Sequence, residues 1–260
     1  MTEPIRFEDG AGYERYMGAW SRLVGDAFLT WLAPDPGGRW LDVGCGNGAF
    51  TELIVTRAAP LSVDGIDPSD AQLIFARSRP ALHAVSFRQG TATALPYPAG
   101  AFDAAVMPLV LFFVPDPQKG VTEMARVVRS GGVVAAYNWD MEGGGFPYAL
   151  LQTSLRELGA SVPSPPHPEV SNVEVMRALW SDAGLTGITM FARTVERTFA
   201  DFEDYWSTVQ LGPSVSATLA ALSAEDTATL RTRLQSLLPT DSAGRITYSA
   251  RAFGVQGRVG

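Results

Sequence analysis

The chain has 260 residues, 46% of them hydrophobic and 18% charged, which is enough to bury a substantial core in one main domain with an elaboration. Its formal net charge of −7 argues against nucleic acid as a partner, because affinity for phosphate backbones comes from clustered Lys and Arg. The single cysteine, Cys45, excludes an intrachain disulfide and a multi-cysteine metal site, and favours a reducing cytoplasm.

Membrane segments are not expected. The first ten residues, MTEPIRFEDG, carry acids and lack the apolar core of a signal peptide. The longest apolar run, residues 104–114, is about half of the roughly 20 residues that span a bilayer. We therefore expect a cytoplasmic protein that binds no membrane and no metal, as a monomer or a homodimer.

Apolar runs suited to buried strands alternate with helical patterns along the first half of the chain. This order is typical of a parallel sheet covered by helices on both faces. A helical segment is expected over 12–33. Helices are then expected at 50–56, 71–77 and 117–128, and strands at about 39–44, 62–66, 84–88, 102–108 and 133–138.

The pattern changes beyond Trp139. A helix is expected between the glycine run 143–145 and the proline-rich segment 162–168, and another at 173–183. Residues 186–198 and 245–255 are strand-like, and the segment between them is largely helical by pattern. The predicted fold is α/β, with a doubly wound, mainly parallel sheet of seven strands. Its expected parts are a helical N-terminal lid (1–33), the main domain (34–199 and 240–260) and a helical cap inserted between the last two strands (200–239).

The segment Trp40-Leu41-Asp42-Val43-Gly44-Cys45-Gly46-Asn47-Gly48 is the most informative part of the chain. An apolar strand that ends in three alternating glycines predicts a turn whose backbone a ligand can approach closely. A carboxylate at position 42 suits a cationic ligand better than a pyrophosphate. The run Gly44-Cys45-Gly46-Asn47-Gly48-Ala49 also fits Gly-x-Gly-x-x-Ala, so dinucleotide binding stays open here.

The same segment resembles the first motif of class I S-adenosylmethionine-dependent methyltransferases. Gly90-Thr91-Ala92-Thr93-Ala94-Leu95-Pro96-Tyr97 resembles the family's Gly-Asp-Ala-x-x-Leu-Pro-Phe segment, which touches adenine, although Thr91 stands where the family has Asp. Arg129-Ser130-Gly131-Gly132 resembles its Arg-Pro-Gly-Gly turn. The resemblance is greatest to the ubiquinone/menaquinone methyltransferase-like group of small-molecule enzymes. It implies a Rossmann-like methyltransferase fold and S-adenosyl-L-methionine as cofactor.

The resemblance also implies a cofactor site. Asp67, at the end of the second strand, is expected to bind both ribose hydroxyls, and it is also a candidate helix N-cap. In the N-terminal helix, Tyr16 and Trp20 are expected to line a lid and Arg22 to pair with the cofactor carboxylate; the alternative is helix packing with a solvated arginine. The expected cofactor-binding residues are Tyr16, Trp20, Arg22, Asp42, Gly44, Gly46, Gly48, Asp67, Pro68, Gln72, Thr91, Ala92, Met107 and Leu111.

The acceptor site is less defined. No Asn/Asp-Pro-Pro-Tyr/Phe motif follows the strand 102–108, which argues against methylation of nucleobases, and no general base is evident. His83 and His167 are expected in solvated loops. The expected substrate-binding residues are Asn138, Trp139, Tyr205, Trp206 and Gln210.

The predicted function is methyl transfer to a small, fairly apolar metabolite by in-line displacement that depends mainly on positioning. Two alternatives stay open: a protein that binds S-adenosylmethionine without transferring the methyl group, and an NAD-dependent oxidoreductase.

Overall fold

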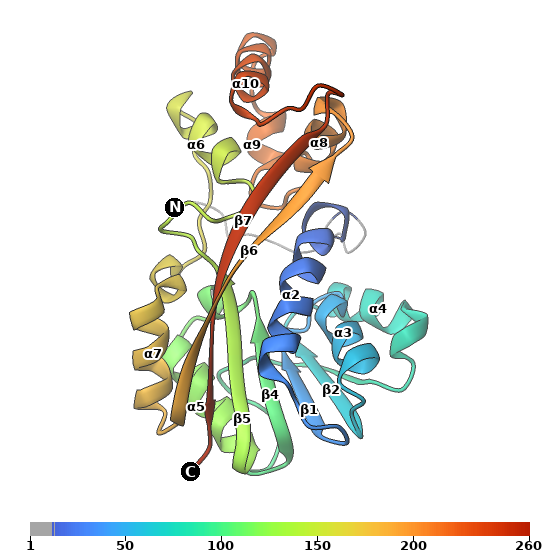
Figure 1. Cartoon of the computed structure of the whole chain (residues 1–260), viewed down its shortest axis with the longest axis vertical. Coiled ribbons are helices and arrows are strands. Elements are labelled where there is room, and N and C mark those ends of the chain that lie inside the picture. Colours follow the sequence, from blue (N-terminus) through green and yellow to red (C-terminus); the bar gives the residue numbers. More distant parts are fainter. Residues whose placement is uncertain (1–11, 13) are drawn as a thin grey trace.

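The computed structural model describes Gly12 and residues 14–260 (Figure 1). In this part of the chain, seven strands form one sheet in the order β3-β2-β1-β4-β5-β7-β6. All neighbouring strands are parallel except β7, which runs antiparallel to both β5 and β6. The predicted seven-stranded, mainly parallel sheet is confirmed. The strands are β1 (Arg39–Val43), β2 (Ser62–Asp67), β3 (Ser86–Gln89), β4 (Phe102–Pro108), β5 (Val128–Trp139), β6 (Thr186–Phe199) and β7 (Ile246–Arg258).

Helices cover both faces of the sheet. Aromatic and aliphatic side chains of α2 and α3 pack on one face, and those of α5 and α7 pack on the other. The α-helices are α2 (Ala19–Leu32), α3 (Ala49–Arg57), α4 (Asp70–Ser78), α5 (Pro117–Val127), α6 (Ala149–Glu157), α7 (Val173–Asp182), α8 (Phe202–Val209), α9 (Ser216–Ala220) and α10 (Ala224–Leu237). Shorter turns are the π-helical η1 (Glu14–Gly18) and the 3₁₀ turns η2 (Pro80–Leu82), η3 (Leu111–Phe113) and η4 (Pro168–Ser171).

Alternation along the strands explains why both faces are apolar. In β4, Ala104 and Val106 belong to the cluster under α2, whereas Ala105 and Met107 belong to the cluster under α5. Successive side chains of a strand point to opposite faces, so a strand buried on both faces needs a continuous apolar run. The run at 102–108 satisfies this requirement.

Strand β5 is longer than predicted. The turn predicted at Arg129–Gly132 lies within β5, where the register with β4 shifts between the pairs Phe102–Val128 and Ala104–Val133. Gly131 has a φ of +73°, a value that glycine adopts without strain. The predicted reversal is therefore an irregularity inside a longer strand, because Gly131 and Gly132 still exchange backbone hydrogen bonds with Val259, which directly follows β7.

The segment between β6 and β7 is helical, as predicted. In Figure 1 these two strands extend beyond the rest of the sheet, and α8, α9 and α10 lie at the far end of the pair. The extension is apolar on one side, where Val195, Phe199 and Ile246 join the core cluster that also contains Tyr205 of α8. The helices therefore stand beyond the carboxyl edge of the parallel strands.

Phe28 of α2 is the centre of an aromatic cluster that fixes this helix to the sheet. The side chain is fully buried, and its ring centroid lies 4.7 Å from Tyr137 of β5 and 5.7 Å from Phe191 of β6. Aromatic pairs at such distances add to the stability that burial provides.

We predict that Phe28→Ala lowers the free energy of unfolding by about 3–5 kcal/mol, because it leaves a cavity among these rings. Urea denaturation of the purified protein measures the change. Leu23 lies on the same helix but is 42% exposed, so Leu23→Ala is the matched control and should change stability by no more than about 0.5 kcal/mol. Equal losses in the two variants would contradict this account of the helix.

Candidate cofactor and substrate site

The turn after β1 has the conformation that its glycines predict. Gly44, Gly46 and Gly48 have φ values of +73°, +51° and +80°. A Cβ on Gly44 would lie 2.5 Å from Val110 Cγ1, and one on Gly48 would lie 2.6 Å from Leu82 Cδ1, so these two glycines allow close packing. A Cβ on Gly46 would meet nothing nearer than Gln72 Oε1 at 4.0 Å. Gly46 therefore borders space that a ligand can occupy.

Asp67 connects the end of β2 to this turn. Its Oδ2 accepts a hydrogen bond from the Gly46 amide at 2.9 Å, and its Oδ1 accepts one from the Ser69 amide at 2.8 Å. Burial raises the pKa of Asp67, and these two amide hydrogen bonds oppose that rise. The cap of α4 is Ser69, whose hydroxyl accepts from the Gln72 amide, so the predicted N-cap role belongs to Ser69 rather than to Asp67.

Asp42 lies beneath the turn and is fully buried. Burial raises its pKa to about 7, the Asp67 carboxylate adds to the rise, and a hydrogen bond from the Thr51 hydroxyl at 2.6 Å opposes it. Within the described residues, Asp42 Oδ1 has no hydrogen-bond partner. An unpaired buried carboxylate oxygen of this kind favours a hydrogen-bond donor or a positive charge nearby.

Glu14 fastens the N-terminal segment to the turn. Its carboxylate accepts hydrogen bonds from Asn47 Nδ2 at 3.2 Å and from Arg79 Nη2 at 2.6 Å, and it also pairs with Arg22. Arg79 in turn donates to the Asn47 carbonyl at 2.7 Å and to Glu52 at 2.8 Å. Burial acts to raise the pKa of Glu14, but the two guanidinium groups outweigh it and lower the pKa. The N-terminal segment thus covers one side of the turn.

Several predicted cofactor residues lie around the turn, and others lie in the core. Arg22 is half exposed and pairs with Glu14, so its pairing with a cofactor carboxylate stays a prediction. Gln72 is buried beside Gly46, and Pro68 is exposed next to Asp67. Thr91 is exposed and Ala92 half-buried after β3. Trp20, Met107 and Leu111 are fully buried core residues.

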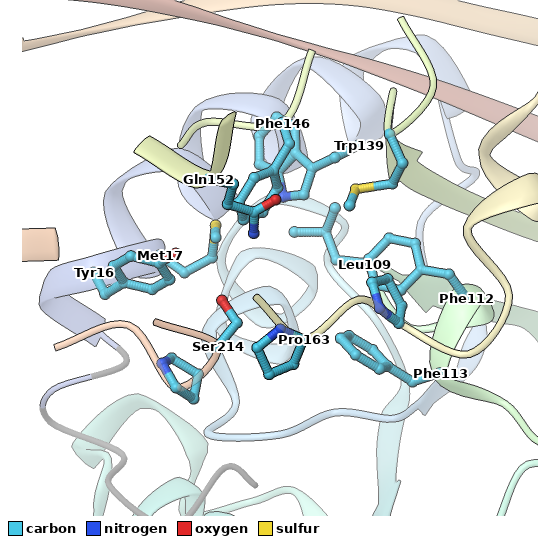
Figure 2. Close-up of a pocket in the computed structure, with 13 residues that line it drawn as sticks. Tyr16, Met17, Leu109, Phe112, Phe113, Trp139, Phe146, Gln152, Pro163 and Ser214 are labelled. Carbon is cyan, nitrogen blue, oxygen red and sulfur yellow. The ribbon is translucent and has the colours of Figure 1, made fainter. Parts of the chain in front are cut away.

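An aromatic cavity opens next to this region (Figure 2). It contains about 510 Å³ of empty space, its opening to solvent included. Its walls come from the N-terminal segment, the carboxyl ends of β4 and β5, α6, the proline-rich segment and the loop after α8. The lining residues are Tyr16, Met17, Leu109, Phe112, Phe113, Trp139, Met141, Phe146, Gln152, Pro163, Pro165, Pro213 and Ser214.

Two contacts bring the aromatic cavity close to the glycine turn. Val110, which follows the lining residue Leu109, packs directly against Gly44. Glu14, which lies in the same π-helical turn as the lining residues Tyr16 and Met17, binds Asn47. A ligand on the turn and a second molecule in the cavity would therefore be neighbours.

Leu109 has an unusual backbone at this junction. Its φ is +60°, a left-handed conformation that is rare for residues with a side chain of this size. The Leu109 amide donates to the Tyr137 carbonyl at 2.7 Å, which holds the strained residue at the end of β4. Strained residues of this kind gather at functional sites, because the surrounding structure must hold them in place.

The predicted substrate residues are spread over different places. Trp139 lines the aromatic cavity, and its indole N–H has no hydrogen-bond partner within the described residues. Asn138 is fully buried and donates to the Val170 carbonyl at 3.4 Å. Tyr205 packs in the core against Phe199, with ring centroids 5.3 Å apart. Trp206 stacks on Phe202, and Gln210 is exposed. Of the five predicted residues, Trp139 alone is among the lining residues of the cavity.

Sequence reasoning missed the polar residues of both regions. Glu14 and Arg79 are far apart in the chain, and only the fold brings them to Asn47. Gln152 and Ser214 come from segments without a recognisable motif. The proline-rich segment folds inward, since Pro163 and Pro165 line the cavity. His167 of this segment lies outside the lining, where its ring nitrogens contact the Glu169 carboxylate at 2.9 Å and the Pro115 carbonyl at 3.3 Å.

Residues 41–136 match the family model for the methyltransferase domain. The chain is 43% identical to 2-methyl-6-phytyl-1,4-hydroquinone methyltransferase 2 of Oryza sativa subsp. japonica over 95 residues. This alignment covers 36% of this chain and 27% of the rice protein. The chain spans from about a quarter to about half of the length of the curated relatives it matches.

Solved structures with a similar fold cover nearly the whole chain. YcgJ of Bacillus subtilis has a TM-score of 0.61 at 19% identity, covering 90% of this chain and 97% of its own. Phosphoethanolamine N-methyltransferase 2 of Haemonchus contortus, solved in complex with S-adenosyl-L-methionine, has a TM-score of 0.57 at 16% identity, covering 97% of this chain and 58% of its own.

The matched segment, the sheet order and the glycine turn together identify a class I S-adenosylmethionine-dependent methyltransferase domain in this chain. S-adenosylmethionine is the cofactor of this class. No helix among the described residues is long and apolar enough to cross a membrane. Over the same residues, no cluster of three or more His, Cys, Asp or Glu is arranged to hold a metal ion.

Asp42 makes stability depend on pH. Because its pKa in the folded protein, about 7, lies above that of an unfolded aspartate, its contribution is fully present below about pH 4 and is lost as pH rises through about 7. We predict that, without ligand, Asp42→Asn gains stability relative to the parent protein between pH 5 and pH 7, by on the order of 2 kcal/mol. Urea denaturation at each pH measures it; a difference between the two proteins that does not change with pH would contradict the burial argument.

Proposed function

We propose that the protein transfers a methyl group from S-adenosylmethionine to a small, fairly apolar acceptor bound in the aromatic cavity. The observation that carries the proposal is the contact between the two regions: Val110, which directly follows the cavity residue Leu109, packs on the glycine turn at Gly44. Methyl transfer needs such an arrangement, because donor and acceptor must lie in line and apart from water.

The residues around the turn fit the cofactor. Gly46 borders open space, and its neighbour Asp67 keeps a carboxylate at the end of β2, where a ribose would bind in a fold of this type. The unpaired oxygen of Asp42 suits a cationic ligand. When bound, the cofactor supplies a methyl group activated by its positively charged sulfur. Tyr16 and Met17 would close the site from the N-terminal side.

The cavity residues indicate how the acceptor reacts. Among the described lining residues there is no carboxylate, histidine or lysine that could act as a general base. A phenol, a thiol or an amine does not need one, because a lone pair of its neutral form can attack the methyl carbon, and the proton that the acceptor loses can pass to solvent at the cavity opening. Positioning of the two reactants can then supply about 7–11 kcal/mol of the barrier reduction. The aromatic walls hold the acceptor and exclude water.

The cofactor role of Asp67 is tested by Asp67→Ala. We expect this variant to bind S-adenosylhomocysteine about 100-fold more weakly in isothermal titration, because it loses two charge-assisted hydrogen bonds to the ribose. Asp64→Ala is the matched control on the same strand, because Asp64 is half-buried and makes no hydrogen bond to the turn. Parent-like affinity in the Asp67 variant would overturn the assignment.

The reaction itself is tested with S-adenosylmethionine carrying a labelled methyl group and a panel of small phenols, thiols and amines. We expect label to appear in an acceptor, and S-adenosylhomocysteine to form only when that acceptor is present. Tight cofactor binding with no transfer to any apolar acceptor, but with transfer to nucleic acid or protein, would contradict the proposal. A cytoplasmic location, which the single cysteine favours, stays a prediction.

A further inference from the structure

The aromatic cavity contains little that could pair with a charged molecule. Five of its lining residues are aromatic, and none of the described lining residues carries a formal charge. Placing an ionised group in such a site removes its water without supplying a partner, which costs several kcal/mol. The described walls therefore favour an uncharged ligand with flat apolar faces.

Two polar side chains interrupt this apolar surface. Gln152 of α6 is 6% exposed and Ser214, in the loop between α8 and α9, is 8% exposed. In Figure 2, the Gln152 amide and the Ser214 hydroxyl both point into the space between Met17 and Pro163. They come from segments far apart in the sequence, and both lie outside the part that matches the methyltransferase domain model.

Both side chains have unused hydrogen-bonding capacity. Among the described residues, Ser214 Oγ makes no hydrogen bond, and Gln152 has only a long contact of 3.5 Å from Arg156 Nη2 to its Oε1. The Gln152 NH₂ group donates to no described protein atom. Both groups face a cavity that opens to solvent, so a ligand that enters displaces water from them, and only a ligand with a hydrogen-bonding atom of its own replaces the lost bonds.

The backbone holds both groups in place. The backbone N–H of Gln152 donates to the Tyr148 carbonyl at 3.1 Å, and the Tyr148 hydroxyl donates to the Tyr16 carbonyl at 2.6 Å. Before Ser214, a Cβ on Gly212 would lie 2.7 Å from the ring of Tyr16, so the loop needs glycine to pack there. The Val215 and Ser216 amides close this loop by donating to the Gly212 carbonyl at 3.0 and 2.8 Å. Because both side chains extend from fixed backbone positions, they can select ligands by shape and hydrogen bonding.

We propose that Gln152 and Ser214 are specificity-determining residues that orient the acceptor, and that the acceptor is an uncharged, planar, largely aromatic molecule with a hydroxyl or carbonyl oxygen. The inference rests on the proposed function only in calling this ligand the acceptor. The ligand's oxygen accepts a hydrogen bond from the side-chain NH₂ of Gln152. The Ser214 hydroxyl donates to this oxygen or, where the ligand has a hydroxyl, accepts from it. The rings of the ligand lie against the aromatic walls. A charged or purely hydrocarbon molecule of the same shape is rejected, since it leaves these groups unpaired or brings an ion without a partner.

The test uses three probes of similar shape: 2-naphthol, 2-methylnaphthalene and 2-naphthoate. Equilibrium dialysis at pH 7.5 measures their binding to the full chain, with and without saturating S-adenosylhomocysteine. We expect 2-naphthol to bind about 10-fold more tightly than either of the others, which corresponds to about 1.4 kcal/mol. Ser214→Ala and Gln152→Leu should each weaken 2-naphthol binding about 5- to 10-fold and leave 2-methylnaphthalene binding unchanged or tighter.

Matched controls come from the same two segments. Thr153 of α6 is exposed, and Ser216 begins α9 outside the cavity lining, so Thr153→Ala and Ser216→Ala should leave the preference among the probes unchanged. A structural defect would weaken all three probes together, whereas loss of an orienting group changes only their ranking. Circular dichroism of each variant checks that it is folded.

Equal binding of 2-naphthol and 2-methylnaphthalene, tightest binding of 2-naphthoate, or no effect of both cavity variants would overturn the inference. A failure of S-adenosylhomocysteine to bind would instead count against the proposed function. The ranking of the probes measured without S-adenosylhomocysteine would still test the roles of Gln152 and Ser214. The two failures are therefore distinguishable.

Discussion

The carboxylate of Asp67 is the contact on which the rest of the candidate cofactor site depends. By accepting from the Gly46 and Ser69 amides, at 2.9 and 2.8 Å, it joins the turn after β1 to the start of α4 after β2. The Gly44 and Cys45 amides add to this junction by donating to the Ile66 carbonyl, at 2.7 and 3.1 Å. A glycine turn has few conformational restraints of its own, so these bonds give it one shape. They also keep a carboxylate beside the open space at Gly46.

A second set of interactions adds the N-terminal segment to this frame. Glu14 binds Arg79 and Asn47 at one end of the segment, and farther along Phe28 packs on the sheet. Ion pairs of partly exposed groups contribute little stability by themselves, so the aromatic packing holds the helix and Glu14 sets where its first turn lies. That first turn carries Tyr16 and Met17, and its position decides the shape of the aromatic cavity.

The sequence is sufficient to predict the sheet and the glycine turn, whereas the cofactor role of that turn stays a prediction. Buried parallel strands appear as continuous apolar runs, and the positions of Gly44, Gly46 and Asp67 follow from local geometry that a few residues define. Strand ends were less well predicted: β5 begins five residues before the predicted start at 133, because an irregularity at Gly131 keeps its pairing with the neighbouring strand.

The acceptor side could not be predicted in the same way, because its residues meet only through the tertiary fold. Trp139 is predictable as a cavity residue because it ends a strand at the carboxyl edge, where ligands bind in sheets of this type, and it does line the aromatic cavity. Tyr205 and Trp206 were chosen for their aromatic character, yet they pack within the helices beyond β6. The same segment contributes Pro213 and Ser214 to the cavity, through a loop that no periodicity indicates.

The central claim is that the glycine turn and Asp67 form a site for S-adenosylmethionine. Isothermal titration of the purified chain with S-adenosylmethionine, S-adenosylhomocysteine and NAD, side by side, tests it most directly. The account predicts that the first two bind at a single site and that NAD does not. Binding of NAD alone, or of none of the three, would contradict it.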